Sequence, residues 1–439
     1  AKEGFAWLKS KLWTPAGSPL ALISFLLIIL PLAFLEFKKM IKTNLLYSFF
    51  IGLAAIMIGG GLAITLYQLI PTGNLAASIL PYPTTWAIAI EAFKQSPLFG
   101  VGPANYLSAF NRFRPINFNQ YDFWNLRFAT GSSYPLQLLT TTGIFGLAAF
   151  IWLSIKIIIN IIKDIKRSNK ISEFRFSLLI CLGLLWFLPV NFTLLFSFFV
   201  FLAVVSSKEK VFELNLTGKT NWLPIVLILP LLATPIYFGS RAYAAEVYFK
   251  KSFDTLAQNL GIQTYNYQIK AIGFNPRRVD FRLAYSQTNL GLANALAART
   301  DLSDQDRTNI SQLVQQAVRE AKIATTLNPT DARTWENLAQ LYRNLINFAQ
   351  GADQWAIAAY QQAIATDPVN PTLRLNLGGL FYALGNYDAA VRQFETTINL
   401  KPDFANGYYN LASAFREQEK YQQAYNAMRT GRAKYPLKP

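Results

Sequence analysis

The sequence contains no histidine, a single cysteine and few acidic residues. Because Cys181 lies inside an apolar run, a disulfide framework and a cysteine-ligated metal site are excluded, and we expect neither a metal nor a cofactor. The 41 lysine and arginine residues outnumber the 24 acidic ones, which gives a net charge of +17. No helix-turn-helix, zinc-finger or RNA-binding signature accompanies this charge, so no nucleic acid partner is predicted.

The overall composition lies between that of a soluble protein and that of a membrane protein. Of the 439 residues, 52% are hydrophobic and 15% aromatic, and the mean hydropathy is +0.22. A chain that combines membrane and soluble parts fits these values best. The sequence starts at Ala1 without a signal-peptide pattern, and we expect further membrane spans upstream of it.

Long apolar runs occupy the N-terminal half of the chain. The predicted membrane segments are residues 18–36, 46–70, 135–162, 176–206 and 222–240. Pro189-Val190-Asn191 interrupts the fourth segment, which predicts two short helices in a hairpin. Pro224, Pro230 and Pro235 predict kinks in the last segment.

Positive charges between these segments predict the orientation of the chain in the membrane. They form three clusters: Lys38, Lys39 and Lys42; Lys163, Lys166, Arg167, Lys170 and Arg175; and Lys208, Lys210 and Lys219. All three lie on one side if segment 176–206 crosses out and back, and that side is expected to be the cytoplasm. The loop 71–134 and the chain after residue 240 are then extracytoplasmic, on a multi-pass protein of the cytoplasmic membrane.

The C-terminal region repeats with a fixed period. Pro368, Pro402 and Pro436 are spaced 34 residues apart, which is the tetratricopeptide period. Asn275-Pro276 and Asn328-Pro329 end similar units upstream, so we count about four units, or five if Tyr243–Pro276 is included. Such helical hairpins bury their apolar faces only when stacked, and their concave surface suits a protein partner or acceptor.

These patterns predict an all-α protein with two domains. Residues 1–240 are expected to form a polytopic helical membrane domain, and residues 241–439 a tetratricopeptide-repeat α-solenoid.

The outer loop 71–134 is expected to begin with a short amphipathic helix. Thr84 and Thr85 are suitable capping residues, and Trp86, Ile90 and Phe93 form one apolar stripe. Such a helix would lie flat on the membrane surface.

Basic and aromatic residues alternate in the rest of this loop. Arg112, Arg114 and Arg127 lie among aromatic residues that include Tyr106 and Trp124. Arginine can bind the oxygens of a pyrophosphate in a bidentate way, and aromatic faces stack on sugar rings, so these five are candidates for binding a lipid-pyrophosphate glycan. The alternative is an aromatic belt whose arginines bind membrane lipid headgroups.

Two short segments carry a family resemblance. Ser96-Pro97-Leu98-Phe99-Gly100-Val101-Gly102-Pro103-Ala104-Asn105-Tyr106 precedes the third apolar segment, which contains Leu136-Gln137-Leu138-Leu139-Thr140-Thr141-Thr142-Gly143-Ile144-Phe145-Gly146-Leu147. Over residues 84–206 the chain resembles the O-antigen ligase/polymerase family of membrane glycosyltransferases. The resemblance implies transfer of a polyprenyl-pyrophosphate-linked glycan on the outer face of the membrane. The structural residues of its motif are here Gly100, Gly102, Pro103, Gly143 and Gly146.

The sequence departs from this family at the expected catalytic position. The family places a histidine and an asparagine where this chain has Ser132 and Ser133, and a glutamate where it has Thr141. Ser132, Ser133 and Gln137 are candidate glycan-binding residues, but a serine is not a base near neutral pH without a partner. Three explanations stay open. In the first, Asp122 or Glu91 acts as the base. In the second, the pyrophosphate leaves without base assistance, and in the third the protein binds glycan without turnover.

Three functions are compatible with these observations. The resemblance favours a metal-independent glycosyltransferase of the ligase or polymerase type. The alternative is a non-catalytic membrane scaffold, in which the repeats recruit partners for cell-envelope assembly. A transport function fits least, because the apolar segments hold few charges.

Overall fold

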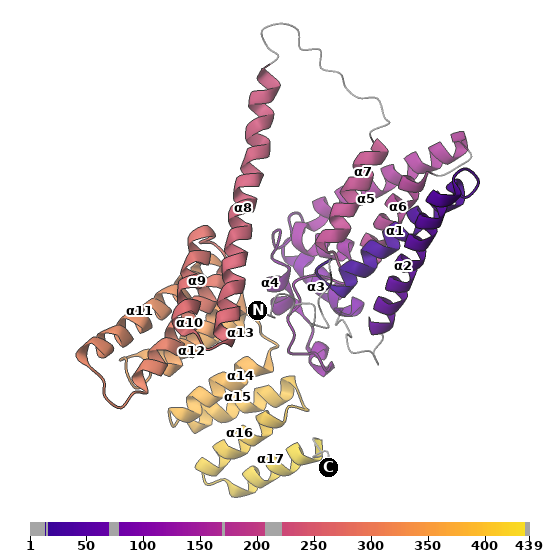
Figure 1. The fold of residues 1–439 in the computed structure, drawn as a ribbon. Helices are drawn as coiled ribbons and strands as arrows, with labels where there is room; N and C mark the ends of the chain where they lie inside the picture. Colours follow the sequence, from indigo (N-terminus) through magenta and orange to yellow (C-terminus); the bar gives the residue numbers. More distant parts are fainter. Residues whose placement is uncertain (1–13, 15, 70–78, 169–171, 207–221, 435–439) are drawn as a thin grey trace. The chain divides into compact units, whose positions relative to one another are not determined.

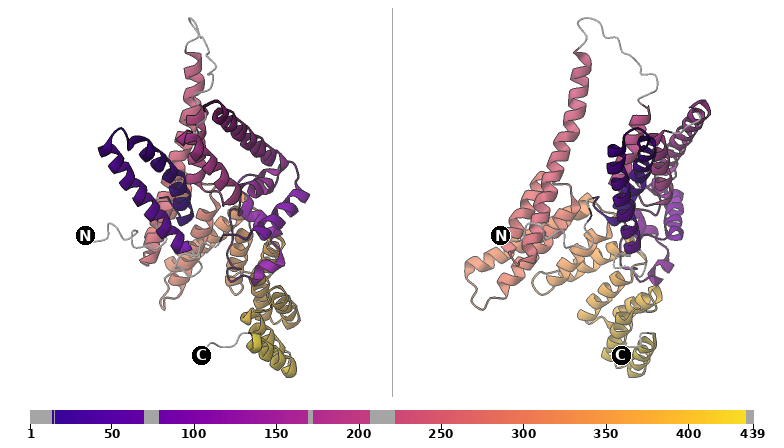
Figure 2. Two further views of the ribbon diagram at one scale, coloured as in Figure 1. Left: turned by 90° about the vertical axis from the view of Figure 1, so that its right-hand side faces the viewer. Right: turned by 45° about the vertical axis from the view of Figure 1, so that its right-hand side comes forward.

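The computed structural model describes residue 14 and residues 16–69, 79–168, 172–206 and 222–434. Every regular element in these ranges is helical, which confirms the all-α prediction (Figures 1 and 2). The chain divides into two compact units, Ala1–Glu213 and Leu214–Pro439, which are described separately below. The boundary predicted at residue 240 stays a prediction. Five residues that the sequence predictions use lie outside the described residues: Lys170, Lys208, Lys210, Lys219 and Pro436.

The first unit begins with a helical hairpin of α1 (Pro19–Met40) and α2 (Leu45–Leu69), which confirms the first two predicted segments as helices. Ser18 caps α1 through its side chain, and proline follows at the first helical position. Gly59 and Gly61 of α2 face leucine side chains of α1, so small residues allow the two helices to approach closely.

The apolar core of this unit lies among α1, α5 (Tyr134–Ser168), α6 (Glu173–Phe187) and α7 (Phe192–Ser206). The break between α6 and α7 falls where the proline-containing interruption predicts it. Three helices among the described residues are long and apolar enough to cross a membrane: Pro19–Met40, Leu45–Tyr67 and Tyr134–Lys166.

The outer loop contains three helical elements, α3 (Tyr82–Gln95), α4 (Tyr106–Phe113) and the 3-10 helix η2 (Ile116–Gln120). The helix predicted here is present, but the prediction that Thr84 and Thr85 cap it is wrong. Pro81 is the N-cap, and both threonines lie on the buried face, where Thr85 donates a hydrogen bond to the Pro81 carbonyl. Of the predicted apolar stripe, Trp86 is 57% exposed, and Ile90 and Phe93 are partly buried.

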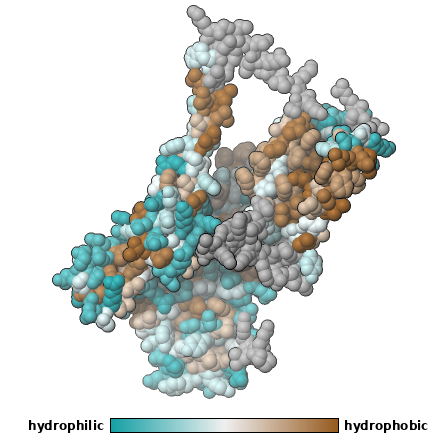
Figure 3. All heavy atoms as spheres, in the orientation of Figure 1, coloured by the Kyte–Doolittle hydropathy of each residue, from teal (hydrophilic) through white to brown (hydrophobic). Residues whose placement is uncertain are grey.

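The second unit begins with the long helix α8 (Leu223–Ala257), which includes the last predicted segment and continues beyond it. The helix is not interrupted at Pro230 or Pro235, and Pro224 occupies its first turn, where proline is tolerated. The side chains of residues 228–240 are all exposed, and Figure 3 shows this part of α8 as an apolar surface.

The C-terminal part of α8 forms the first of five helical hairpins in the described residues. The other helices are α9 (Gly261–Phe274), α10 (Val279–Ala297), α11 (Asp304–Leu327), α12 (Ala332–Asn344), α13 (Ala352–Thr366), α14 (Pro371–Ala383), α15 (Tyr387–Leu400), α16 (Ala405–Glu417) and α17 (Tyr421–Lys434). They pack in consecutive pairs and stack as a solenoid (Figure 1). The predicted repeat that includes Tyr243–Pro276 is therefore present.

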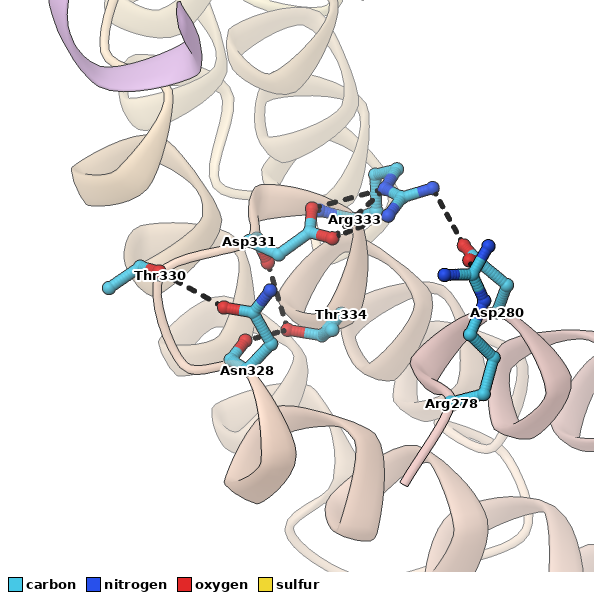
Figure 4. Close-up of polar contacts among 7 residues, drawn as sticks. All are labelled: Arg278, Asp280, Asn328, Thr330, Asp331, Arg333 and Thr334. Carbon is cyan, nitrogen blue, oxygen red and sulfur yellow. Dashed lines mark hydrogen bonds and ion pairs between the residues drawn. The ribbon is translucent and has the colours of Figure 1, made fainter. Parts of the chain in front are cut away.

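The turns between hairpins share one geometry, which Figure 4 shows between α11 and α12. Asn328 ends α11 in an extended conformation, and Asp331 donates its backbone N–H to the Asn328 carbonyl at 3.3 Å. The Asp331 carboxylate caps α12 and binds Arg333, whose guanidinium also reaches Asp280 of α10 at 3.0 Å. These ion pairs raise the pKa of Arg333 although burial opposes them, so the guanidinium stays charged and links adjacent hairpins.

Close packing of α14 against α15, the two helices of one hairpin, depends on a small residue opposite an aromatic one. A Cβ atom on Gly378 would lie 2.5 Å from the ring of Phe394, which is 1% exposed. We expect Phe394→Ala to lower the free energy of unfolding of this unit by about 3–5 kcal/mol, because it leaves a cavity in the buried cluster that Phe394 forms with Leu411 and Ala412 of α16. Phe348→Ala is the control, since Phe348 is 86% exposed. Circular dichroism during thermal unfolding of the full chain checks this, and equal losses in the two variants would contradict it.

Candidate functional site

The two segments that carry the family resemblance lie against each other in the structure. The backbone N–H groups of Val101 and Gly102 each donate to a carbonyl of α5, those of Thr140 and Thr141, at 3.0 Å. In the opposite direction, Ile144 of α5 donates its N–H to the Pro97 carbonyl at 2.9 Å. The turn after α3 is therefore joined to α5 by three backbone hydrogen bonds, and the ring centroids of Phe99 and Phe145 also lie 5.5 Å apart.

These bonds are possible because α5 opens at Gly143. In a regular helix Ile144 would donate to the carbonyl four residues earlier, that of Thr140. Gly143 instead has φ 65° and ψ −157°, a conformation essentially confined to glycine. The opening releases the Thr140 and Thr141 carbonyls to accept hydrogen bonds from the turn.

The motif glycines also allow the two backbones to approach. A Cβ atom on Gly100 would lie 2.5 Å from the Thr140 carbonyl oxygen, and one on Gly143 would lie 2.5 Å from the Leu98 carbonyl. Gly100 and Gly102 have positive φ values of 64° and 100°. Pro103 is exposed, and a side chain on Gly146 would meet Thr142.

Ser132, at the position where the family has its histidine, is fully buried. Its hydroxyl donates to the Leu80 carbonyl at 2.7 Å and is hydrogen-bonded to the hydroxyl of Thr85 on α3. Ser133 is also buried, and the side-chain oxygen of Gln137 accepts the Gly131 N–H at 3.3 Å. These contacts join the start of α5 to α3.

The three arginines of the loop differ in their surroundings. Arg114 is 4% exposed, and its guanidinium lies over the rings of Phe110 and Phe118, with its central carbon 5.2 and 5.7 Å from their centroids. Arg112 is exposed and lies over the ring of Phe113, and Arg127 is partly buried. The outer loop therefore presents at least one arginine to solvent and encloses another.

The remaining candidates also divide into buried and accessible groups. Tyr106 is 1% exposed, and burial raises the pKa of its hydroxyl well above the usual value, so it stays neutral. Trp124 is partly buried and Asp122 is exposed.

Sequence reasoning did not single out three groups that form part of this region. Thr85 and the Leu80 carbonyl hold Ser132, and the Asn111 side chain is fully buried on α4. Both amide atoms of Asn111 are without a hydrogen-bond partner among the described residues. The sequence predicts Thr85 only as a helix cap. Nothing in the local sequence pattern indicates the roles of the Leu80 carbonyl and Asn111. Within the part of the chain that the structure describes, no group of three or more metal-ligating side chains is present.

Comparison with known proteins gives a match in each unit. A family described as O-Antigen ligase matches residues 12–151, which include both signature segments. A family described as TPR repeat matches residues 345–385 and 378–419. The chain therefore carries an O-antigen ligase domain at its N-terminus and tetratricopeptide repeats at its C-terminus, as the sequence predicted.

Several individual proteins are similar to part of this chain. Tetratricopeptide repeat protein 5 of Bos taurus is 34% identical over 110 residues, which are 24% of each chain, so this chain spans about a quarter of that relative's length. The crystal structure of MamA protein is 20% identical, with a TM-score of 0.35 over 45% of this chain and 97% of that one. A thermophilic TPR protein of Thermus thermophilus is 17% identical, with a TM-score of 0.33 over 44% and 93%.

The glycine conformation at the opening of α5 leads to a prediction. We expect Gly143→Ala to lower the thermal stability of the detergent-solubilised protein, because the backbone strain alone costs about 1–3 kcal/mol and the new Cβ would overlap the Leu98 carbonyl. Gly183→Ala in α6 is the matched control, since a Cβ there meets nothing within 4 Å. Unfolding is followed by intrinsic fluorescence. A Gly143→Ala protein as stable as the Gly183→Ala protein would show that the pairing of α5 with the turn does not support the fold.

Proposed function

We propose that this protein transfers a glycan from a polyprenyl-pyrophosphate carrier to an acceptor on the outer face of the cytoplasmic membrane. The O-antigen ligase domain supports glycan transfer as the general function, and the apolar helices support a membrane location. The observation that carries the proposal is the backbone pairing of the turn at Val101 and Gly102 with α5, because it holds the arginine-containing loop next to an apolar helix.

In this proposal Arg112 and Arg127 bind the pyrophosphate of the donor. Arg112 is exposed, and both residues are permanently charged, which suits a ligand with several negative charges. Arg114 was also a candidate, but its enclosure by Phe110 and Phe118 favours a different role. It keeps the loop in the shape that presents the other two arginines.

The reaction joins an acceptor hydroxyl to the first sugar of the donor. The hydroxyl oxygen attacks the anomeric carbon, the bond from that carbon to the pyrophosphate oxygen breaks, and the polyprenyl pyrophosphate leaves with the electron pair. Negative charge therefore develops on the pyrophosphate, where arginine stabilises it. No electron transfer is involved, and one proton has to leave the acceptor hydroxyl.

We assign the removal of this proton to Asp122, whose side chain is exposed on the same loop. Ser132 is unsuited to the role, because its hydroxyl is buried and hydrogen-bonded to Leu80 and Thr85. Glu91 is the competing carboxylate, but it forms an ion pair with Lys94 at 2.6 Å on the surface of α3. Ser133 is buried and Gln137 partly buried, so both would act through the shape of the site.

The positive clusters around the apolar helices support a topology in which the loop and the solenoid are extracytoplasmic. Tetratricopeptide repeats support protein interaction, so we propose that the solenoid binds the acceptor or an assembly partner.

Replacement of Arg112 and Arg127 tests donor binding. We expect Arg112→Gln/Arg127→Gln to lower glycan transfer about 100-fold or more, because charge on the leaving pyrophosphate loses its partners. Lys94→Gln, which removes an exposed cation from α3, should leave the rate unchanged. The assay measures transfer from a purified lipid-linked oligosaccharide to acceptor, with membrane insertion verified for each variant. Undiminished transfer by the double variant would reject the donor site.

Replacement of the proposed base tests the proton transfer. Asp122→Asn should lower kcat about 100-fold or more and leave KM for the donor nearly unchanged, since a general base acts in the transition state. Glu91→Gln should retain the wild-type kcat. A large loss in Glu91→Gln and none in Asp122→Asn would transfer the role to Glu91, and no loss in either would indicate departure of the pyrophosphate without base assistance.

One observation favours a second function, that of a non-catalytic scaffold. The chain has no histidine, and the serine at the corresponding position serves to join α5 to α3. A scaffold would bind lipid-linked glycan without releasing polyprenyl pyrophosphate. Release of polyprenyl pyrophosphate above a no-protein control, measured with the purified protein, separates the two functions.

A further inference from the structure

The first hairpin of the solenoid carries a patch of cations at one end. Arg241 lies on α8, Lys270 lies near the end of α9, and Arg277 lies in the turn that follows α9. Arg241 donates to the carbonyls of Gly273 and Phe274, at 3.0 and 3.3 Å, and to the hydroxyl of Tyr237 at 3.1 Å. These bonds hold the end of α9 at the level of Arg241.

This level is also where the exposed apolar part of α8 ends. The side chains before it include Leu231, Leu232 and Ile236, which are 73%, 58% and 70% exposed. Such a surface is stable in lipid and unfavourable in water, and Figure 3 shows its continuity along the helix. Tyr237 follows it and has the amphipathic ring typical of the membrane–water boundary.

Between the two helices lies a shallow pocket with apolar walls and two cations. Its lining consists of Tyr237, Arg241, Ile269, Lys270, Gly273 and Phe274. Lys270 lies over the rings of Tyr248 and Tyr267, with its nitrogen 5.7 and 5.8 Å from the centroids, and is exposed to solvent. The ammonium group is therefore held beside the pocket and is accessible from outside.

The charge around the pocket is positive. The nearby carboxylates, Glu246 and Asp280, pair with Arg278 at 3.7 and 3.2 Å, and Asp280 also pairs with Arg333. Within the described residues no ion pair neutralises Arg241, Lys270 or Arg277. A ligand for this patch therefore needs a negative group next to hydrocarbon.

We propose that this patch binds the headgroup of an anionic phospholipid and holds the first hairpin of the solenoid against the bilayer surface. The phosphodiester contacts Lys270 and Arg277, and the acyl chains follow the apolar walls of the pocket toward the exposed part of α8. A free phosphate ion would leave those walls in contact with water. This inference rests on the membrane segment that the sequence predicts at residues 222–240 and on the membrane location in the proposed function, but not on the glycan transfer reaction.

The test compares two lipid environments and one matched pair of variants. The full chain is placed in nanodiscs of phosphatidylcholine alone or of phosphatidylcholine mixed with phosphatidylglycerol. Retained phosphatidylglycerol is counted by native mass spectrometry, and hydrogen exchange is followed over residues 269–278. Lys270→Gln/Arg277→Gln removes two exposed cations from the patch. Lys250→Gln/Arg307→Gln removes two exposed cations elsewhere in the solenoid and is the control.

We expect phosphatidylglycerol to slow exchange over residues 269–278 in the wild-type and control proteins. The patch variant should bind this lipid about fivefold more weakly for each cation removed. Equal lipid retention by both double variants, or exchange that is the same in both lipid mixtures, would overturn the proposal. Displacement of the lipid by inorganic phosphate would also overturn it, because the site would then recognise the free ion. Since no donor glycan is present, these outcomes are independent of whether transfer occurs.

Discussion

The opening of α5 at Gly143 is the constraint on which the outer site depends. A helix that opens inside an apolar environment would leave backbone carbonyls without partners, which is costly. Here Thr140 and Thr141 receive hydrogen bonds from the turn after α3, and that turn receives one from Ile144 in return. The opening of the helix and the fold of the turn therefore support each other. The positive-φ conformations of Gly100 and Gly143 therefore belong to one arrangement, in which each allows the hydrogen bonds between the turn and α5.

This arrangement explains why the family signature consists of two separate segments. Each segment supplies the hydrogen-bond partners that the other lacks, and the glycines are needed because a Cβ atom would occupy the space between the two backbones. The motif therefore defines a scaffold for the loop, and in the proposed reaction the reacting groups are side chains that the loop presents. Ser132 fits this view, because its hydroxyl is fully used in joining α5 to α3.

Sequence reasoning reached the fold more readily than the site, for physical reasons. Apolar runs and a 34-residue period are averaged over many residues, so the helices and the solenoid could be predicted. The conformation of Gly143 depends on a turn about forty residues earlier, and a glycine in an apolar helix is ordinarily explained by packing. The enclosure of Arg114 similarly depends on Phe110 and Phe118, which lie on two different elements. Long-range contacts of this kind have no periodic signal in the sequence.

The length of α8 shows how one helix can serve two environments. Its first part exposes apolar side chains, while its last part packs against α9, with Ala245 fully buried in the contact with Ala271 and Phe281. A hydropathy pattern detects the first part and a repeat pattern the second, so the sequence analysis treats as two segments what the structure describes as one helix, Leu223–Ala257. Within the second unit, the exposed apolar segment and the first helix of the solenoid are therefore parts of one helix, Leu223–Ala257. Arg241 joins this helix to the last carbonyls of α9. A partner on the repeats would be connected to the apolar segment through helical structure and not through an irregular linker.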